Sequence, residues 1–217
     1  MQKRLLVLVA AVFLGLIVAY SQANAPRPSG SAQTALVHDR HDGLDVSADP
    51  YTDTERAKNK FGKANPVPAG ILPVEVFLRN ELDQPIRIDL STVQLEVRPP
   101  EGEHQEVDAL STEEVAKAIV HPGGPPGPTT RRFPPIGIPS SGNDKKVTNM
   151  MQNLQPFALD ADVVPPNAMI HGFLFFNVSH NLSVASYASL YIPDAMIAPS
   201  NKPLMFYEVS LKGAAGK

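Results

Sequence analysis

Histidine and aspartate side chains follow one another closely in the run VHDRHD, residues 37–42. Imidazole nitrogens and carboxylate oxygens are ligands that divalent metal ions take in proteins, provided that a turn gathers them around one point. The candidate metal ligands in this run are His38, Asp39, His41 and Asp42. Their spacing matches no familiar ligand pattern. The sequence therefore leaves open a metal site and a plain solvated segment leading into a strand, and it indicates no cofactor.

The histidines could also serve a hydrolase if the fold brought His38 and His41 together with His180 on neighbouring loops. The sequence contains no Gly-x-Ser-x-Gly elbow, no His-Glu-x-x-His motif, no P-loop and no dinucleotide fingerprint. Cysteine is absent, which excludes cysteine nucleophiles and thiolate metal sites. We therefore expect a non-enzymatic protein, with a secreted hydrolase as the alternative.

A proline-rich stretch, residues 121–142, could dock a protein partner. Its PxxP spacings beside two arginines are the composition of a polyproline-II ligand. The residues that would carry the contact are Pro125, Pro128, Arg131, Arg132 and Pro135. Proline-rich composition alone is unspecific, so a solvated loop inserted in one domain remains the other interpretation.

Two Asn-x-Ser patterns, at Asn177 and Asn181, fit the acceptor motif for N-glycosylation. The motif is short enough to arise by chance. It predicts modification only if the host glycosylates exported proteins.

Strands must carry most of these side chains. Apolar and polar residues alternate over 43–49, which predicts a strand covered on one face. Alternation over 72–78 and 86–90, with turn residues between, predicts a hairpin. After Leu90 the apolar residues move from even to odd positions, so Ser91 and Thr92 must contain a bulge, bend or break.

The last third of the chain returns to strands after a helical region. Residues 168–180 are apolar on both faces, which indicates a central strand covered twice. Further strands are predicted over 186–193 and 203–211. The second of these strands should carry four residues on one side, namely Met205, Tyr207, Val209 and Leu211.

Two short helices are predicted on either side of the proline-rich stretch. Ser111 and Glu114 have the spacing of a capping box, and the helix that follows should end at His121. A second helix should begin at Asn143 or Asp144 and end before Pro156. Each has one narrow apolar stripe and needs a larger surface to lie on.

The N-terminus has the pattern of a secretory signal peptide over residues 1–25: two basic residues, an uncharged apolar run and small residues at 23–25. Membrane attachment is expected only if this segment stays uncleaved. Residues 26–36 form a predicted flexible spacer. Without Lys3 and Arg4 the formal net charge falls from −3 to −5, which argues against nucleic acid as a partner.

These patterns predict a mainly β protein, an antiparallel immunoglobulin-like sandwich of about seven strands in a single domain at residues 37–212. A helix–Pro-rich loop–helix insertion occupies residues 108–158, because the strands beyond it are too few to fold alone. Residues 213–217 are a tail.

Several segments resemble known proteins. Residues 71–90 resemble the early strands of secreted bacterial immunoglobulin-like domains. Together with the proline-rich insertion, residues 41–51, 61–80, 163–181 and 188–195 resemble an uncharacterised family of exported proteins in acidobacteria and similar Gram-negative bacteria. The resemblance implies a periplasmic or extracellular protein, and it brings no assigned activity. We expect a binding or structural module of the cell envelope, with a possible protein partner there.

Overall fold

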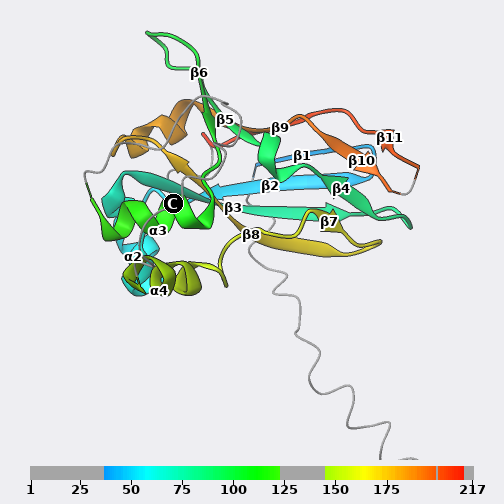
Figure 1. Cartoon of the computed structure of the whole chain (residues 1–217). Helices are drawn as coiled ribbons and strands as arrows, with labels where there is room; N and C mark the ends of the chain where they lie inside the picture. The colour runs from blue at the N-terminus through cyan, green and yellow to red at the C-terminus, as the bar shows by residue number, and fades with distance from the viewer. Residues whose placement is uncertain (1–36, 123–144, 199, 213–217) are drawn as a thin grey trace, which may run out of the picture. The chain divides into compact units, whose positions relative to one another are not determined.

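A computed structural model of the chain describes residues 37–122, 145–198 and 200–212 (Figure 1). The predicted signal peptide, spacer and C-terminal tail lie outside these residues, as does most of the proline-rich stretch. The described residues are mainly β, with few helices, which confirms the predicted class.

The strands form three antiparallel sheets of four strands each. Sheet A has the order β1 (His38–His41), β2 (Leu44–Pro50), β3 (Ile71–Asn80) and β8 (Met169–Asn177). Sheet B has the order β11 (Lys202–Pro203), β10 (Ala195–Ile197), β4 (Ile86–Ile88) and β7 (Val163–Val164). Sheet C has the order β12 (Tyr207–Ser210), β9 (Ala188–Ile192), β5 (Gln94–Val97) and β6 (Gln105–Asp108). The described residues thus contain twelve strands, where about seven were predicted.

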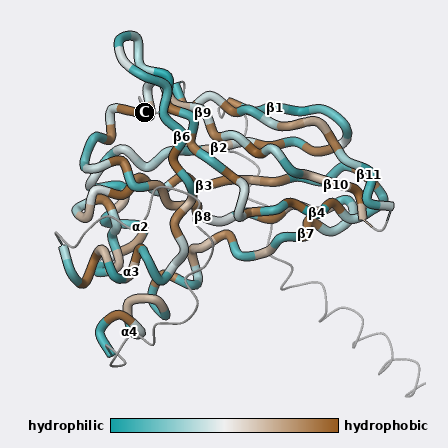
Figure 2. The backbone as a smooth tube through the Cα atoms, turned by 45° about the horizontal axis from the view of Figure 1, so that its top comes forward, coloured by the Kyte–Doolittle hydropathy of each residue, from teal (hydrophilic) through white to brown (hydrophobic). Residues whose placement is uncertain are grey.

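Sheets B and C together face the inner side of sheet A. One continuous hydrophobic core joins the even residues of β2 and β3 to apolar side chains of β4, β5, β9 and β12. Figure 2 shows hydrophobic residues, in brown, along β3 and β4. The core therefore draws on segments from both sides of the predicted insertion. Burial of such apolar area is the main favourable term in folding.

The predicted break after Leu90 is confirmed. A 3-10 helix, η4 (Leu90–Thr92), follows β4, and Asp89 caps it by accepting a hydrogen bond from the backbone N–H of Ser91 at 3.0 Å. Because the turn shifts the alternation, inward residues are even in β4 and odd in β5. One segment of chain thereby contributes to both sheet B and sheet C.

The predicted hairpin between residues 72–78 and 86–90 is wrong. β3 pairs with β2 and β8, whereas β4 pairs with β10 and β7. The connection is an arch that crosses from one layer to the other. Alternation could not distinguish the two outcomes, because both place the even residues in the core.

The prediction for residues 168–180 is partly right. β8 is covered on both faces, with Leu174 and Phe176 in the main core and Phe173 and Phe175 on the other side. It is the last strand in the order of sheet A and not a central one. Isolated bridges join Ala109 to Phe176 and Ala158 to Phe173, so its outer edge is partly occupied.

Helices cover the outer face of sheet A near the start of β3 (Figure 1). They are α2 (Thr54–Phe61), α3 (Thr112–Val120) and α4 (Lys145–Leu154), with short 3-10 turns η2 (Gly62–Ala64), η3 (Val67–Ala69) and η5 (Leu182–Tyr187). The capping box of Ser111 and Glu114 is present as predicted. A second hydrophobic cluster joins these helices to Phe173 and Phe175 of β8. We call this region the helix end.

Candidate functional site

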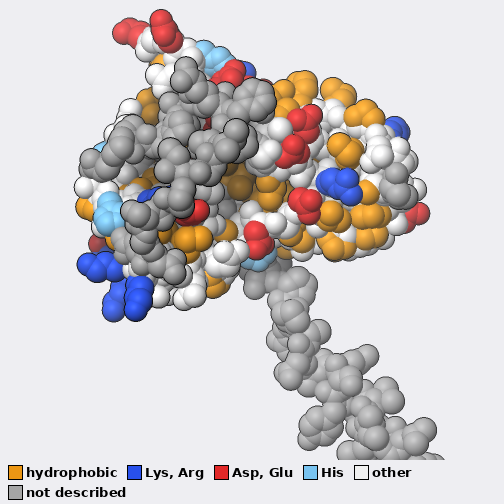
Figure 3. Space-filling model, in the orientation of Figure 1, with side chains coloured by type: hydrophobic (Ala, Val, Ile, Leu, Met, Phe, Trp, Pro, Cys, Tyr) orange, Lys and Arg blue, Asp and Glu red, His pale blue; other side chains and the backbone are white. Residues whose placement is uncertain are grey.

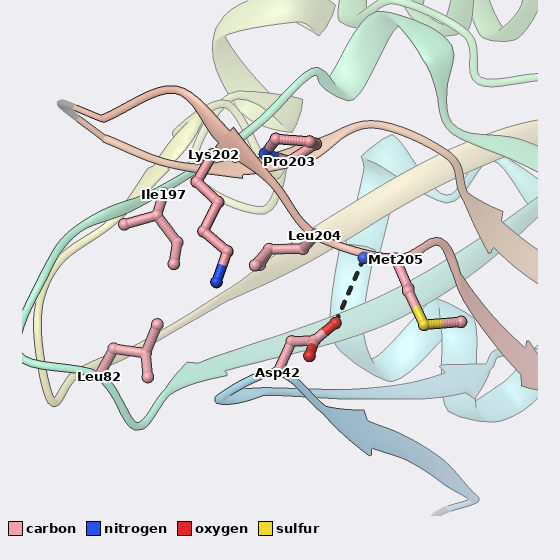
Figure 4. Close-up of a pocket in the computed structure, with 7 residues that line it drawn as sticks. All are labelled: Asp42, Leu82, Ile197, Lys202, Pro203, Leu204 and Met205. Carbon is pink, nitrogen blue, oxygen red and sulfur yellow. Dashed lines mark hydrogen bonds between the residues drawn. The ribbon is translucent and has the colours of Figure 1, made fainter.

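Three connections meet at the opposite end of β3, which we call the loop end. They are the β1–β2 turn, the β3–β4 arch and the β10–β11 hairpin with the residues that follow it. Between them lies a pocket of about 490 Å³ (Figure 4). Its lining residues are Asp42, Leu82, Ile197, Lys202, Pro203, Leu204 and Met205. Five of these seven are apolar, which is typical of small-molecule sites.

The β1–β2 turn requires glycine at its second position. Asp42 and Gly43 have φ angles of 49° and 82°, the left-handed pair of a two-residue type I′ hairpin. A Cβ added to Gly43 would lie 2.3 Å from Cδ2 of Leu82. Leu82 therefore packs directly on the bare backbone of the turn, and this contact fixes one wall of the pocket.

The arch is held by a buried amide. Asn80 is 1% exposed, and its Nδ2 donates to the carbonyl oxygens of Gln84, Val164 and Pro165 at 2.8, 3.1 and 3.1 Å. Its Oδ1 accepts from the backbone N–H of Leu82 at 2.9 Å. A buried polar group is stable only when it is hydrogen-bonded in this way. The backbone that carries Leu82 is consequently rigid.

The third wall is tied to the arch and to β10. The backbone N–H of Ala198 donates to the carbonyl of Pro85 at 2.9 Å, and that of Leu204 donates to the carbonyl of Ala195 at 2.9 Å. Ile197 and Leu204 therefore face Leu82 across a space whose walls are joined by backbone hydrogen bonds. Such a pre-formed cavity needs little rearrangement to accept a ligand.

Two opposite charges border the pocket. The side chain of Lys202 extends into the space between Leu82, Ile197 and Leu204 (Figure 4). Asp42 lies across from it, and its Oδ2 accepts a hydrogen bond from the backbone N–H of Met205 at 3.4 Å. The same oxygen lies 3.4 Å from Nδ1 of His41.

Two large hydrophobic side chains are exposed here, the lining residue Met205 and its chain neighbour Phe206. On the face of the molecule seen in Figure 3, hydrophobic side chains gather over β4, β7 and β10. Met205 is 62% exposed and Phe206 is 48% exposed. The ring of Phe206 lies 5.6 Å from that of Tyr191. The prediction that Met205 shares one side of a strand with Tyr207 is wrong, because β12 begins only at Tyr207 and the alternation does not extend back to residue 205.

The candidate metal ligands do not gather around one point. Nε2 of His41 lies 3.6 Å from Oδ2 of Asp39, whereas its Nδ1 lies 3.4 Å from Oδ2 of Asp42, so the two carboxylates face different nitrogens of the ring. His38 turns to the outer face of sheet A, where its Nδ1 lies 3.1 Å from Oδ1 of Asp45. Asp39 accepts from the backbone N–H of Glu208 at 3.0 Å, and the ring of His41 stacks on Tyr207 at 4.1 Å. No group of three or more His, Cys, Asp or Glu in the described residues could hold a metal ion.

Residues 38–42 therefore join strand β1 to strand β12, and we call this set of contacts the clasp. Besides the stacking of the rings, the hydroxyl of Tyr207 donates to the carbonyl of His41 at 3.1 Å. Burial, together with the nearby carboxylates of Asp42 and Asp39, raises the pKa of Tyr207 above its usual range. The clasp closes one side of the sandwich by joining edge strands of sheets A and C.

The histidines of the hydrolase alternative are also far apart. His41 pairs with Leu44, which in turn pairs with Asn80 at the end of β3. His180 lies against Gly70, just before β3 begins. The intervening strand spans about 30 Å at the usual rise per residue.

The other candidates remain predictions. Pro125, Pro128, Arg131, Arg132 and Pro135 lie outside the described residues.

Of the two glycosylation candidates, Asn177 is the last residue of β8 and Asn181 directly precedes η5. Oδ1 of Asn177 accepts from the backbone N–H of Ser179 at 3.0 Å, and Oδ1 of Asn181 accepts from Oγ of Ser183 at 2.6 Å. Their modification stays a prediction.

A buried ionisable network lies between sheet A and α2. Glu75 is 7% exposed; its Oε2 accepts from the hydroxyl of Tyr51 at 2.9 Å, and its Oε1 lies 3.4 Å from both Nζ of Lys60 and Nδ1 of His171. Burial, reinforced by Glu75, raises the pKa of Tyr51 to about 12.

Arg56 stacks over Tyr51, with its guanidinium carbon 3.8 Å from the ring centroid. It also forms a two-pronged ion pair with Asp49, and these hydrogen bonds raise the pKa of the arginine. Each charged group here is engaged with a neighbour, so the network serves to hold α2 on the sheet.

The comparisons with known proteins give no family. The sequence matches no family model, no curated protein and no solved structure. Within the part of the chain that the structure describes, no helix is long and apolar enough to cross a membrane.

Sequence reasoning missed most of the pocket. Leu82, Ile197, Lys202 and Leu204 come from segments far apart in the chain, and no local pattern joins them. One signal was present: Asp-Gly at residues 42–43 is a strong indicator of a two-residue hairpin. It would have identified β1 as a strand and placed Asp42 at a sheet end.

Proposed function

We propose that the protein is an exported, non-enzymatic binding module with an immunoglobulin-like sandwich, periplasmic or extracellular, that binds a small apolar molecule in the loop-end pocket. The observation that carries the proposal is the pocket itself. Its walls are apolar, and backbone hydrogen bonds and the Gly43–Leu82 contact hold them apart. Small ligands bind preferentially in such pre-formed apolar cavities with a few polar groups at the rim.

Three further observations support the proposal. The N-terminal 25 residues have the pattern of an export signal, and the cysteine-free chain needs no disulfide. Two layers of antiparallel strands with ligand-accessible loops at one end are the general plan of immunoglobulin-like binding domains. The histidines that a hydrolase would use take part in structural contacts and are separated along β3.

Titration with 1-hexanol, a neutral apolar probe, tests the function. Amide chemical shifts followed by ¹H–¹⁵N NMR should change saturably at Leu82, Ile197 and Leu204. Ile197→Trp should weaken the shifts, because the larger side chain takes up part of the pocket against which the probe packs. Phe206→Trp is the matched control: Phe206 is bulky and exposed near the pocket but does not line it. Shifts that are absent, unsaturable or equally strong in Ile197→Trp would refute binding in this pocket.

A further inference from the structure

Lys202 and Asp42 both line the loop-end pocket, but they form no ion pair with each other. Within residues 37–122, 145–198 and 200–212, no acidic side chain forms an ion pair with Lys202. Its ammonium group nevertheless extends among Leu82, Ile197 and Leu204, where it meets no carboxylate (Figure 4). An ammonium group has three N–H donors, and because Lys202 is exposed, these are open to water or to a ligand.

The negative charge across the pocket is, by contrast, already engaged. Oδ2 of Asp42 accepts from the backbone N–H of Met205 and lies near Nδ1 of His41, both at 3.4 Å. The group that most lacks a partner is therefore the cation. A ligand that fits this pocket should carry an apolar body for the walls and an anionic head for Lys202.

Resting on the proposed binding function, we infer that the pocket selects a small aliphatic monocarboxylate. The carboxylate accepts hydrogen bonds from Nζ of Lys202, and the chain lies against Leu82, Ile197 and Leu204. A doubly charged phosphate head would meet only one cation, with Asp42 opposing its second charge. A volume of about 490 Å³ bounded by three connections suits a small molecule.

Four probes with the same six-carbon chain test the inference by calorimetry at low salt: hexanoate, 1-hexanol, hexylamine and hexyl phosphate. Because Lys202 is exposed, the charge preference should be modest. Hexanoate should bind about two- to fivefold tighter than hexanol. Hexylamine and hexyl phosphate should bind more weakly than hexanoate. The preference should shrink as salt is added, since exposed charges are screened.

Lys202→Gln should make hexanoate and hexanol equal, whereas Lys212→Gln, an exposed lysine outside the lining, should leave the preference unchanged. Asp42→Asn should raise the hexanoate affinity, and Asn-Gly keeps the turn intact.

Each other outcome overturns the inference in a distinguishable way. Equal binding of hexanoate and hexanol by the wild-type protein removes carboxylate selection and leaves the binding function standing. Tightest binding of hexylamine assigns selection to Asp42, and tightest binding of hexyl phosphate assigns the site to phosphate esters. No binding of any probe overturns the inference and the proposed function together.

Discussion

At the helix end, the ring of Phe173 packs edge-on against that of Phe61 and stacks with that of Phe175. The buried and partly buried charged groups nearby are paired, Glu75 with Lys60 and Asp49 with Arg56. At the loop end, Met205 and Phe206 are exposed and Lys202 has no ion-pair partner among the described residues. The same strands, β3 and its neighbours, run between the two ends.

The difference shows that packing at the helix end stabilises the fold, whereas the loop end leaves surface available for contacts with other molecules. Covering the aromatic face of β8 required helices on both sides of the proline-rich stretch. The loop end has a rigid frame, held by Asn80 and Gly43, and within the described part of the chain its Met205 and Phe206 stay exposed. A site for a ligand is drawn from the second kind of region.

The largest effect is expected at the helix end. Phe173 is 2% exposed and contacts the rings of Tyr51, Phe61 and Phe175, so Phe173→Ala should lower the free energy of unfolding by about 3–5 kcal/mol. Urea denaturation monitored by circular dichroism measures this loss. Leu82→Ala, at the loop end, should destabilise less. If Leu82→Ala were the more damaging substitution, the loop end would be a second core.

Alkaline pH should also act through the helix end. The pKa of Tyr51 is about 12 in the folded protein and near 10 in an unfolded chain, so the native state holds this proton more tightly. The stabilisation that follows from this difference in pKa is complete below pH 10 and is lost as pH rises toward 12. Wild type should therefore lose about 2–3 kcal/mol more than Tyr51→Phe over that range. The free energies of unfolding come from urea titrations at each pH. If wild type and Tyr51→Phe lost equal stability between pH 10 and 12, the ionisation of Tyr51 would not be coupled to folding.

Alanine substitutions at Gly43 and Gly62 distinguish the effect of a packing clash on stability from the effect of backbone strain. Both have positive φ, but a Cβ on Gly43 would strike Leu82 whereas one on Gly62 has nothing within 4 Å. Gly43→Ala should cost about 1–3 kcal/mol beyond the loss in Gly62→Ala, and it should also weaken hexanol binding. Equal losses in the two variants would mean that Leu82 moves freely.

The smallest effect is expected from Met205. Its side chain is mostly exposed, so Met205→Ala should change the free energy of unfolding by less than about 0.5 kcal/mol. The same substitution should weaken hexanol binding, because Met205 lines the pocket. A stability loss comparable to that of a core residue would contradict an open loop end.

The features predicted correctly from sequence are local ones. The capping box at Ser111, the strand at residues 43–49 and the break after Leu90 each depend on neighbouring residues. The capped helix forms where its own polar groups and apolar stripe require it.

The features that failed depend on distant partners. Whether residues 86–90 pair with β3 or cross to another sheet is decided by β7 and β10, about eighty and a hundred residues along the chain. The exposure of Met205 depends on where pairing of β12 with β9 begins. The pocket joins residue 42 to residues 82, 197 and 202–205, so only the folded chain could reveal it.

A crystal structure with 6-bromohexanoate tests the central claim most directly, because anomalous scattering from bromine locates the ligand without bias. The account predicts a bromine peak inside the loop-end pocket, with the carboxylate about 3 Å from Nζ of Lys202. A peak at the helix end, or a saturated protein whose pocket holds no ligand, would contradict it.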